Sequence, residues 1–231
     1  MGIKKIKEYN LPVTEELPQN KVPWELNKND AILLIHDMQQ YFLDAYDSKN
    51  SLYKTLVQNI KYLKEFCIRN NIPVIYSAQP KGQTDEQRGL LLDFWGKGIP
   101  QEGASKEIVE QLQPDKNDFI ITKWRYSAFE NTDLYEIIKQ LNKSQLIICG
   151  VYAHIGCLST TITAFSRGIK PFFVADAMGD FSREKHLMAL EYVSQLAGKV
   201  VTIRDIVGKD EEKRSKRDAM SEHCHMEGLL V

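Results

Sequence analysis

A polar cluster follows the first strongly apolar run of the chain. Residues 31–35 read Ala-Ile-Leu-Leu-Ile, and His36 and Asp37 come directly after them. Five consecutive apolar residues have the length of a buried strand. In an open α/β sheet the carboxyl ends of the strands face the ligand crevice, so Asp37 is a candidate general acid or base. The alternative is that Asp37 only caps the next helix.

Each later apolar run also ends in polar residues. These are Gln79 and Arg88 after the second run, Lys123 and Tyr126 after the third, Tyr152 and Gly156 after the fourth, and Asp176 and Asp180 after the fifth. Because parallel strands end on one edge of a sheet, we expect Asp37, Lys123 and the loop at Tyr152 to converge. The helix that this loop opens would offer unpaired N–H groups to an anion. Asp37 and Lys123 could instead form a structural ion pair, but such pairs contribute little to stability, which favours a functional site.

The segments that carry these residues alternate between strand-like and helix-like patterns. Strands are predicted at 31–36, 73–78, 118–122, 145–149, 171–175 and 199–203, and helices near 52–70, 132–141, 155–168 and 183–197. In the first helix Leu52, Leu56 and Ile60 recur at helical spacing. The alternation predicts an α/β fold with an open, mainly parallel six-stranded sheet, helices on both faces and right-handed crossovers.

Two regions depart from this alternation. Residues 79–112 form a long excursion between strands, which we expect to arch over the strand ends as a partial lid. Residues 208–231 are charge-dense, and we interpret them as a charged tail or frayed helix. His223, Cys224 and His225 in that tail could bind a metal, but a solvated tail is favoured because adjacent side chains diverge.

The composition limits the class of protein. The 231 residues suit one domain, the formal net charge is −1, and no basic stretch suggests nucleic acid. The apolar runs are too short to cross a bilayer, and the charged N-terminus does not resemble a signal peptide, so we expect no membrane partner. The four cysteines show no metal-like pairing, which favours a cytoplasmic location.

Several motifs together resemble the isochorismatases. They are Leu-Leu-Ile-His-Asp-Met-Gln-Gln-Tyr-Phe at 33–42, Tyr-Ser-Ala-Gln-Pro at 76–80, Glu-Gln-Arg-Gly-Leu-Leu-Leu-Asp-Phe-Trp-Gly at 86–96, Lys-Trp-Arg-Tyr-Ser-Ala-Phe at 123–129, Cys-Gly-Val-Tyr-Ala-His-Ile-Gly-Cys at 149–157, the run at 164–177, and Asp-Phe-Ser at 180–182. The resemblance implies a three-layer, Rossmann-like isochorismatase domain at 1–207, whose arm at 1–30 is similar to that of siderophore-pathway members. A C-terminal tail at 208–231 would follow, without an aryl carrier domain.

The wider superfamily acts through Asp, Lys and a Cys nucleophile, and the resemblance places Asp37 and Lys123 in the first two positions. Gly156 stands where the cysteine would be, as in true isochorismatases, and we expect it to leave room for a substrate ring. Cys157 is one residue late, so its side chain should point about 100° away, into packing. Nicotinamidase-like relatives bind a metal after the second strand, but Gln79-Pro80-Lys81-Gly82 supplies no imidazole there. We therefore expect no metal and no other cofactor.

The resemblance implies hydrolysis of the vinyl ether of isochorismate to pyruvate and 2,3-dihydro-2,3-dihydroxybenzoate. A vinyl ether hydrolyses by protonation at carbon, so the reaction needs a carboxylic acid that is protonated in the complex. We assign this role to Asp37, with Lys123 turned partly toward the substrate.

Resemblance and position assign the substrate carboxylates to Gln79, Arg88, Lys123, Tyr152 and the N–H of Gly156. Arg88 could instead be a solvated lid residue. Phe42, Trp95 and Tyr126 are expected to enclose the ring, although each could be ordinary core. The bond between Val151 and Tyr152 resembles the site of a cis peptide in this family.

Other functions stay open at this point. The chain could hydrolyse 2-amino-2-deoxyisochorismate in phenazine-type synthesis, or act as an amidohydrolase through Cys157. It could also be a non-catalytic interaction module, although the presence of both Asp37 and Lys123 favours an enzyme. An aryl carrier protein could be supplied separately, and a homodimer is the expected assembly.

Overall fold

The computed structural model describes residues 3–103 and 107–208. The charged tail expected from residue 208 onward, with the alternative metal site at His223, Cys224 and His225, lies outside the described residues except for Gly208.

Six strands form one sheet in the order β3-β2-β1-β4-β5-β6. They are β1 (Ala31–His36), β2 (Val74–Ala78), β3 (Phe119–Thr122), β4 (Gln145–Val151), β5 (Lys170–Gly179) and β6 (Lys199–Val201). All neighbouring pairs are parallel. The predicted fold class is therefore confirmed, and within the described strands the sheet is wholly rather than mainly parallel.

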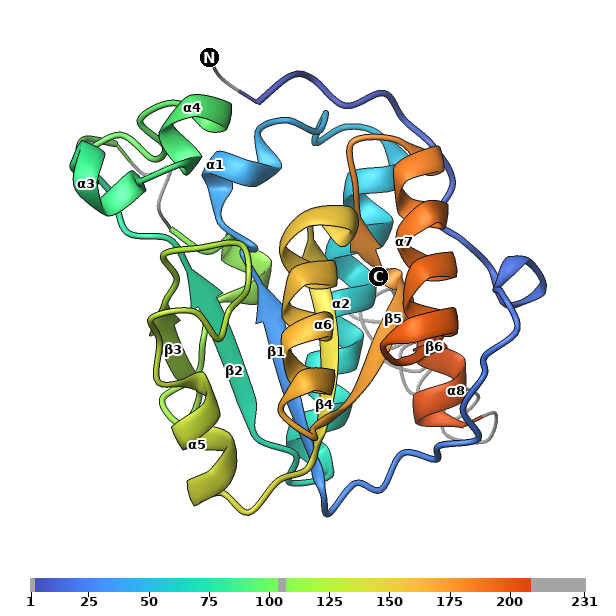
Figure 1. Cartoon of the computed structure of the whole chain (residues 1–231). Helices are drawn as coiled ribbons and strands as arrows, with labels where there is room; N and C mark the ends of the chain where they lie inside the picture. Colours follow the sequence, from blue (N-terminus) through green and yellow to red (C-terminus); the bar gives the residue numbers. More distant parts are fainter. Residues whose placement is uncertain (1–2, 104–106, 209–231) are drawn as a thin grey trace, which may run out of the picture.

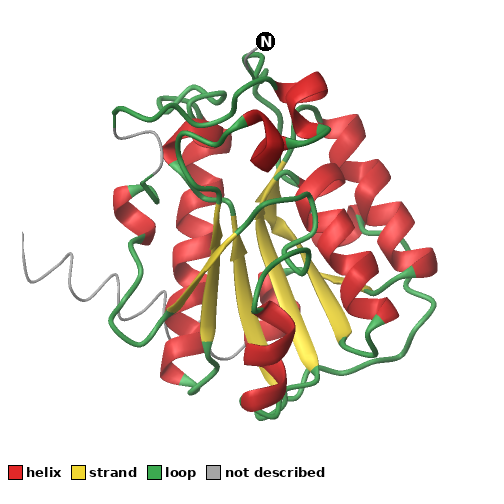
Figure 2. Cartoon of the chain, turned by 60° about the vertical axis from the view of Figure 1, so that its left-hand side comes forward, coloured by secondary structure: helices red, strands yellow, loops and turns green. Residues whose placement is uncertain are grey.

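Helices cover both faces of this sheet (Figures 1 and 2). In Figure 1, α5 (Leu134–Gln140), α6 (Leu158–Ser166) and α7 (Arg183–Leu196) lie in front, and α2 (Ser51–Arg69) lies behind, where it contacts α8 (Ile203–Val207). The shorter elements are η1 (Thr14–Glu16), α1 (Gln40–Leu43), α3 (Asp85–Arg88), α4 (Leu91–Trp95), η3 (Glu110–Leu112) and the π-helical turn η4 (Ala153–Cys157).

The central strand β1 shows why the sheet needs both helical layers. Successive side chains of a strand point to opposite faces. Leu33 and Ile35 accordingly lie in the core with α2, and Ile32 and Leu34 in the core with α6 and α7. All four side chains are completely buried. A strand buried on both faces requires an uninterrupted apolar run, which is what residues 31–35 provide.

Strands β4 and β5 are longer than predicted. A register shift between Ile148 and Gly150 lets β5 pair with β4 as far as Gly179. Asp176 therefore lies inside β5, where its side chain accepts a hydrogen bond from the Ile203 N–H, rather than at the strand end. The last strand is shorter than predicted, because Thr202 caps α8 through a capping box with Asp205.

The long excursion between β2 and β3 carries α3 and α4, which Figure 1 shows above the carboxyl ends of the strands, as predicted. The N-terminal arm runs along the outside of the domain; its Asn20 side chain pairs with the backbone of Val200 at β6. Among the described residues, no helix has the length and apolar character needed to cross a membrane.

Candidate active site

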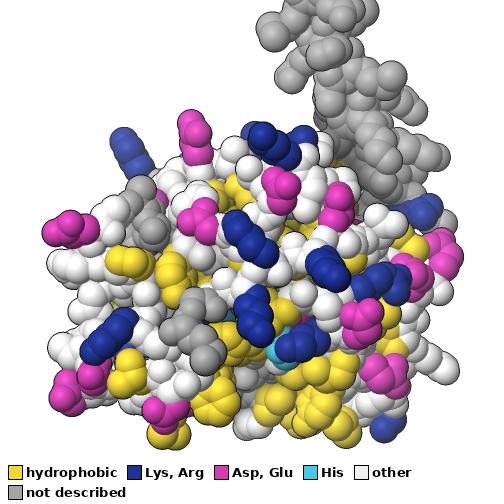
Figure 3. Space-filling model, turned by 90° about the horizontal axis from the view of Figure 1, so that it is seen from above, with side chains coloured by type: hydrophobic (Ala, Val, Ile, Leu, Met, Phe, Trp, Pro, Cys, Tyr) yellow, Lys and Arg dark blue, Asp and Glu magenta, His cyan; other side chains and the backbone are white. Residues whose placement is uncertain are grey.

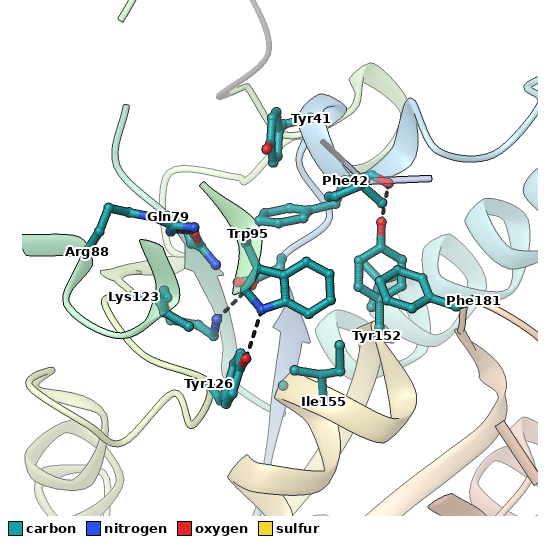
Figure 4. Close-up of a pocket in the computed structure, with 15 residues that line it drawn as sticks. Tyr41, Phe42, Gln79, Arg88, Trp95, Lys123, Tyr126, Tyr152, Ile155 and Phe181 are labelled. Atoms are coloured by element: carbon teal, nitrogen blue, oxygen red, sulfur yellow. Dashed lines mark hydrogen bonds and ion pairs between the residues drawn. The ribbon is translucent and has the colours of Figure 1, made fainter. Parts of the chain in front are cut away.

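A pocket lies at the carboxyl ends of the strands, under α3 and α4 (Figure 4). Strands β1 and β4 are neighbours at its floor, and the chain continues from β1 to β2 on one side and from β4 to β5 on the other. This is the point where the strand order reverses, which is where open α/β sheets bind ligands.

Asp37 is the central carboxylate of the pocket. Its Oδ2 accepts a 2.8 Å hydrogen bond from Nζ of Lys123, and its Oδ1 accepts one of 2.7 Å from Oγ of Ser77. Asp37 and Lys123 are 4% and 2% exposed. The two residues come from the ends of β1 and β3, two strands apart, so the predicted convergence of Asp37 and Lys123 is confirmed.

The charge state of Asp37 follows from these contacts. Burial raises the pKa of Asp37, but the Lys123 charge and the hydrogen bonds from Lys123 and Ser77 outweigh it, so this pKa lies below its ordinary value. Asp37 also adopts a φ of +50°, which only a few non-glycine residues do. The pocket thus holds an ionised carboxylate with a cation against it.

The position of Gly156 differs from the expectation. A Cβ added to residue 156 would lie 2.2 Å from Cε1 of His36, so the space without a side chain is filled by the His36 imidazole and is not open to a substrate ring. His36 is fully buried, and its Nδ1 lies 2.9 Å from the Val151 carbonyl oxygen. Burial lowers the pKa of His36 to about 4, so the ring is neutral near pH 7. Gly156 still lines the pocket through its backbone.

One wall of the pocket is polar. Arg88 is 3% exposed, which excludes the solvated-lid alternative. Its Nη1 lies 3.2 Å from Oε1 of Gln79 and from Oε1 of Gln83, and its Nε donates to the Gly96 carbonyl. Gln39 binds both backbone groups of Gln79, at 2.7 and 2.9 Å. Figure 4 shows Gln79, Arg88 and Lys123 together on this side.

The opposite wall is apolar and mainly aromatic. The rings of Tyr152 and Phe181 lie 4.3 Å apart between centroids, and the Tyr152 hydroxyl donates to the Phe42 carbonyl at 2.6 Å. The Val151–Tyr152 peptide bond is cis, as the resemblance implied. Trp95 lies across the pocket and donates from Nε1 to the Tyr126 hydroxyl at 2.8 Å (Figure 4).

All residues that the sequence nominated for the site line this single pocket. They are Asp37, Phe42, Gln79, Arg88, Trp95, Lys123, Tyr126, Tyr152 and Gly156. The lining residues that were not nominated are Ile3, Tyr41, Leu91, Val151, Ile155 and Phe181. All of these except Ile3 stand inside the motifs quoted for the family resemblance, which could have identified them. Ile3 belongs to the arm, and no local pattern connects it with the pocket.

Cys157 points away from the pocket, as expected. It is completely buried in the core between the sheet and α6 and α7, and burial raises the pKa of its thiol well above the ordinary value. A nucleophilic cysteine needs accessible thiolate, so the geometry disfavours a thiol mechanism. Within residues 3–103 and 107–208, no group of three or more His, Cys, Asp or Glu side chains is arranged to hold a metal ion.

Comparison with known proteins gives the class to which this fold and site belong. Residues 31–205 match the model of the isochorismatase domain family. The chain is 46% identical over 207 residues to enterobactin synthase component B of Escherichia coli (strain K12), which covers 90% of this chain and 73% of that protein. It is 49% identical over 194 residues to the isochorismatase of Bacillus subtilis (strain 168), covering 84% of this chain and 62% of that protein.

A third relative comes from a different pathway. Phenazine biosynthesis protein PhzD1 of Pseudomonas aeruginosa is 45% identical over 206 residues, which covers 89% of this chain and 99% of that protein. The chain belongs to the isochorismatase family, and it is a hydrolase of that family.

Proposed function

We propose that this protein hydrolyses the vinyl ether of isochorismate, giving pyruvate and 2,3-dihydro-2,3-dihydroxybenzoate. The observation that carries the proposal is the buried contact between Asp37 and Lys123 in a pocket that also contains Arg88. The relative from Bacillus subtilis, which is named isochorismatase, supports the choice of substrate.

The charges of the pocket suit a dianion. Among the described residues that line it, Lys123 and Arg88 are the cations and Asp37 is the carboxylic acid. When Asp37 is protonated, two cations face the two carboxylates of the substrate, and a guanidinium can bind one carboxylate in a bidentate manner. On the outer face above the pocket, Lys and Arg side chains are interspersed with Asp and Glu (Figure 3). The selectivity for an anion therefore comes from inside the pocket.

The proposed reaction begins with binding. A substrate carboxylate draws Lys123 away from Asp37, which removes the main interaction that lowers the pKa of Asp37. Burial and the negative charge of the substrate then raise that pKa, so Asp37 takes up a proton. Exclusion of water by Trp95 and Tyr126 strengthens both effects.

Asp37 then donates its proton to the methylene carbon of the enolpyruvyl group. The resulting oxocarbenium ion is stabilised by the ether oxygen and captured by water, whose proton returns to the Asp37 carboxylate. The hemiketal that forms collapses to pyruvate and the ring diol, so one water is consumed and no thiol or metal takes part. General acid catalysis of this kind contributes about 10²–10⁴-fold to a rate.

The test is release of pyruvate from isochorismate by the wild-type protein and by Asp37→Asn. We expect the wild-type protein to release pyruvate, and we expect kcat of Asp37→Asn to be at least about 100-fold lower. Asp44→Asn is the matched control, because Asp44 is an exposed carboxylate at the end of α1 and does not line the pocket. Failure of the wild type to release pyruvate, or near-normal turnover by Asp37→Asn, would refute the proposal.

A second candidate substrate is 2-amino-2-deoxyisochorismate. It is supported by PhzD1, the phenazine protein that this chain covers almost completely. The two substrates differ by an amino group in place of a hydroxyl, so the ratio of their kcat/KM values decides between them. We propose isochorismate as the better substrate, because the relative from Bacillus subtilis, which is named isochorismatase, has the higher identity, 49% against 45% for PhzD1.

We further propose that residues 1–207 form the catalytic domain, with residues 1–30 as its arm, and that the protein works in siderophore synthesis in the cytoplasm. Three free, buried cysteines, at positions 67, 149 and 157, support a reducing location. A homodimer and a separately supplied aryl carrier protein belong to this proposal, and light scattering of the purified protein tests the first of them.

A further inference from the structure

We infer that Asp180 is a positioning residue, which acts through His154 and Phe181 to hold the apolar wall of the pocket against the acid at Asp37. This inference rests on the proposed function. Asp180 does not line the pocket itself, and none of the steps above uses it.

The carboxylate of Asp180 is completely buried and accepts three hydrogen bonds. Its Oδ2 accepts from the His154 backbone N–H at 2.7 Å. Its Oδ1 lies 2.5 Å from Nδ1 of His154 and accepts from the Phe181 N–H at 2.7 Å. Asp180 follows β5, and His154 lies in η4, the turn after β4. One carboxylate therefore links the ends of the neighbouring strands β4 and β5. We call Asp180, together with its hydrogen-bond donors His154 and Phe181, the Asp180 clamp.

The groups that the clamp fastens are those that face the substrate. Phe181 contributes its ring to the wall and contacts Tyr152. His154 is followed directly by Ile155 and Gly156, which both line the pocket, and its ring lies 5.5 Å from that of Phe181. Figure 4 shows Tyr152, Ile155 and Phe181 together, across the pocket from Lys123. Loss of the clamp would move this wall and leave the polar wall in place.

The backbone of Asp180 has independent anchors. Its N–H donates to the Tyr9 hydroxyl at 2.8 Å, and its carbonyl lies 3.4 Å from the hydroxyl of Tyr46. Asp180→Asn should therefore leave the backbone of residue 180 in position while changing the hydrogen bonds of its side chain. An asparagine amide has only one oxygen to accept hydrogen bonds, so at least one of the three donors would meet its NH₂ group.

The expected result is a separation of kcat from KM. In the proposed complex the charge of the substrate carboxylates is met by Lys123 and Arg88 on the polar wall, so we expect KM to change by less than about threefold. The ring, and with it the methylene carbon, would lie less well aligned with Asp37, and misplacement of about 1 Å can cost 100-fold in rate. We therefore predict that Asp180→Asn lowers kcat by about 10- to 100-fold.

The experiment measures pyruvate release and thermal unfolding for a small set of variants. His154→Ala should reproduce the kcat defect, and His154→Asn should restore most of kcat, since its amide nitrogen can occupy the place of Nδ1. Asp118→Asn is the control for a purely structural effect. It breaks a 3.1 Å ion pair with the largely buried Lys64, outside the pocket, and should lower Tm without changing kcat.

A spectroscopic readout is independent of activity. In the wild type, the Nδ1 proton of His154 should give a downfield NMR resonance, because it is donated to a carboxylate, and this resonance should vanish in Asp180→Asn. An Asp180→Asn variant that loses Tm but keeps wild-type kcat and KM would overturn the positioning role alone. Absence of pyruvate from the wild type would instead contradict the proposed reaction.

Discussion

The two walls of the pocket are built in different ways from the two halves of one sheet. The polar wall comes from β1, β2, β3 and the excursion that follows β2, and it holds Asp37, Arg88 and Lys123 through charged hydrogen bonds. The apolar wall comes mainly from the ends of β4 and β5, where ring contacts and the Asp180 clamp hold Tyr152 and Phe181. Phe42 from α1 and Trp95 from α4 complete it.

This difference separates two tasks. Charged groups in a buried site interact strongly, so in the proposed mechanism the polar wall determines which charge is bound and when Asp37 is protonated. Apolar contacts are weak individually and act through shape, so in the proposed mechanism the apolar wall determines where the substrate ring lies. Substitutions in the polar wall should therefore have large effects, and single changes in the aromatic groups small ones.

The largest effect is expected for Lys123→Met. The change removes both a substrate contact and the partner of Asp37, and we predict a fall in kcat/KM of about 10²- to 10³-fold, as found when one transition-state donor is lost. Steady-state pyruvate release measures it. A decrease of less than tenfold would show that Lys123 is only a structural partner of Asp37.

The same variant has a pH-dependent stability. In the wild type the lowered pKa of Asp37 stabilises the fold above the ordinary carboxyl pKa of about 4, and this contribution is lost as pH falls through the folded pKa. Without Lys123, burial raises the pKa of Asp37, so ionisation opposes folding as pH rises. Thermal unfolding should therefore show a smaller Tm difference between Lys123→Met and wild type near pH 4 than at pH 7. In the double variant Asp37→Asn/Lys123→Met no carboxyl group titrates at position 37, so its Tm difference from wild type should lose this increase between pH 4 and pH 7.

The next largest effect is expected for Arg88→Lys, which keeps the charge and removes the planar, bidentate donor. A charged hydrogen bond is worth about 1.5–3 kcal/mol, so KM should rise by about 10- to 100-fold with a smaller change in kcat. Lys97→Met is the control, because Lys97 is an exposed cation close by that does not line the pocket. If the two variants had equal KM values, Arg88 would not be a substrate-binding residue.

Gly156→Ala should affect folding more than chemistry. Its Cβ would overlap the His36 ring, and overpacking of this kind costs about 1–3 kcal/mol in the free energy of unfolding. Urea unfolding of Gly156→Ala, His36→Ala and the double variant gives a double-mutant cycle. The double variant should be less destabilised than the sum of the two single changes, since the shorter side chain at 36 makes room. Strict additivity would contradict this steric account.

The smallest effect is expected for Tyr126→Phe, which removes the hydrogen bond to Trp95 and keeps the aromatic ring. A net hydrogen bond of about 0.5–1.5 kcal/mol corresponds to a loss of about 2- to 10-fold in kcat/KM. Tyr135→Phe, on α5 outside the pocket, should leave kcat/KM unchanged. If Tyr126→Phe had a larger effect than Arg88→Lys, the contrast between the charged and the aromatic groups of the pocket would be wrong.

The sequence predicts the fold well because both sheet faces are covered by helices. That arrangement requires uninterrupted apolar strands such as 31–35, separated by amphipathic helices such as 52–70. The lengths of β4 and β5 were not predictable, since they depend on a register shift between the strands and not on residue type. The end of β6 could have been predicted from the sequence, because Thr202 and Asp205 have the spacing of a capping box.

For the site, the placement of the residues was predictable where it depends on residue type and strand ends. Asp37 and Lys123 are polar residues directly after apolar runs, and parallel strands bring such residues together. The role of His36 beneath Gly156 could not be predicted, because it depends on the close packing of two residues 120 positions apart, which leaves no space for a Cβ at position 156. Ile3 was missed for the same reason: the path of the arm is set by tertiary packing.

The central claim is that Asp37 becomes the proton donor only when a dianionic substrate binds. Calorimetric titration with a saturated lactyl ether analogue of the substrate, in buffers of different ionisation enthalpy at pH 7, counts the protons taken up on binding. The account predicts uptake of close to one proton by the wild type and none by Asp37→Asn. No uptake by the wild type, or the same uptake by both proteins, would contradict it.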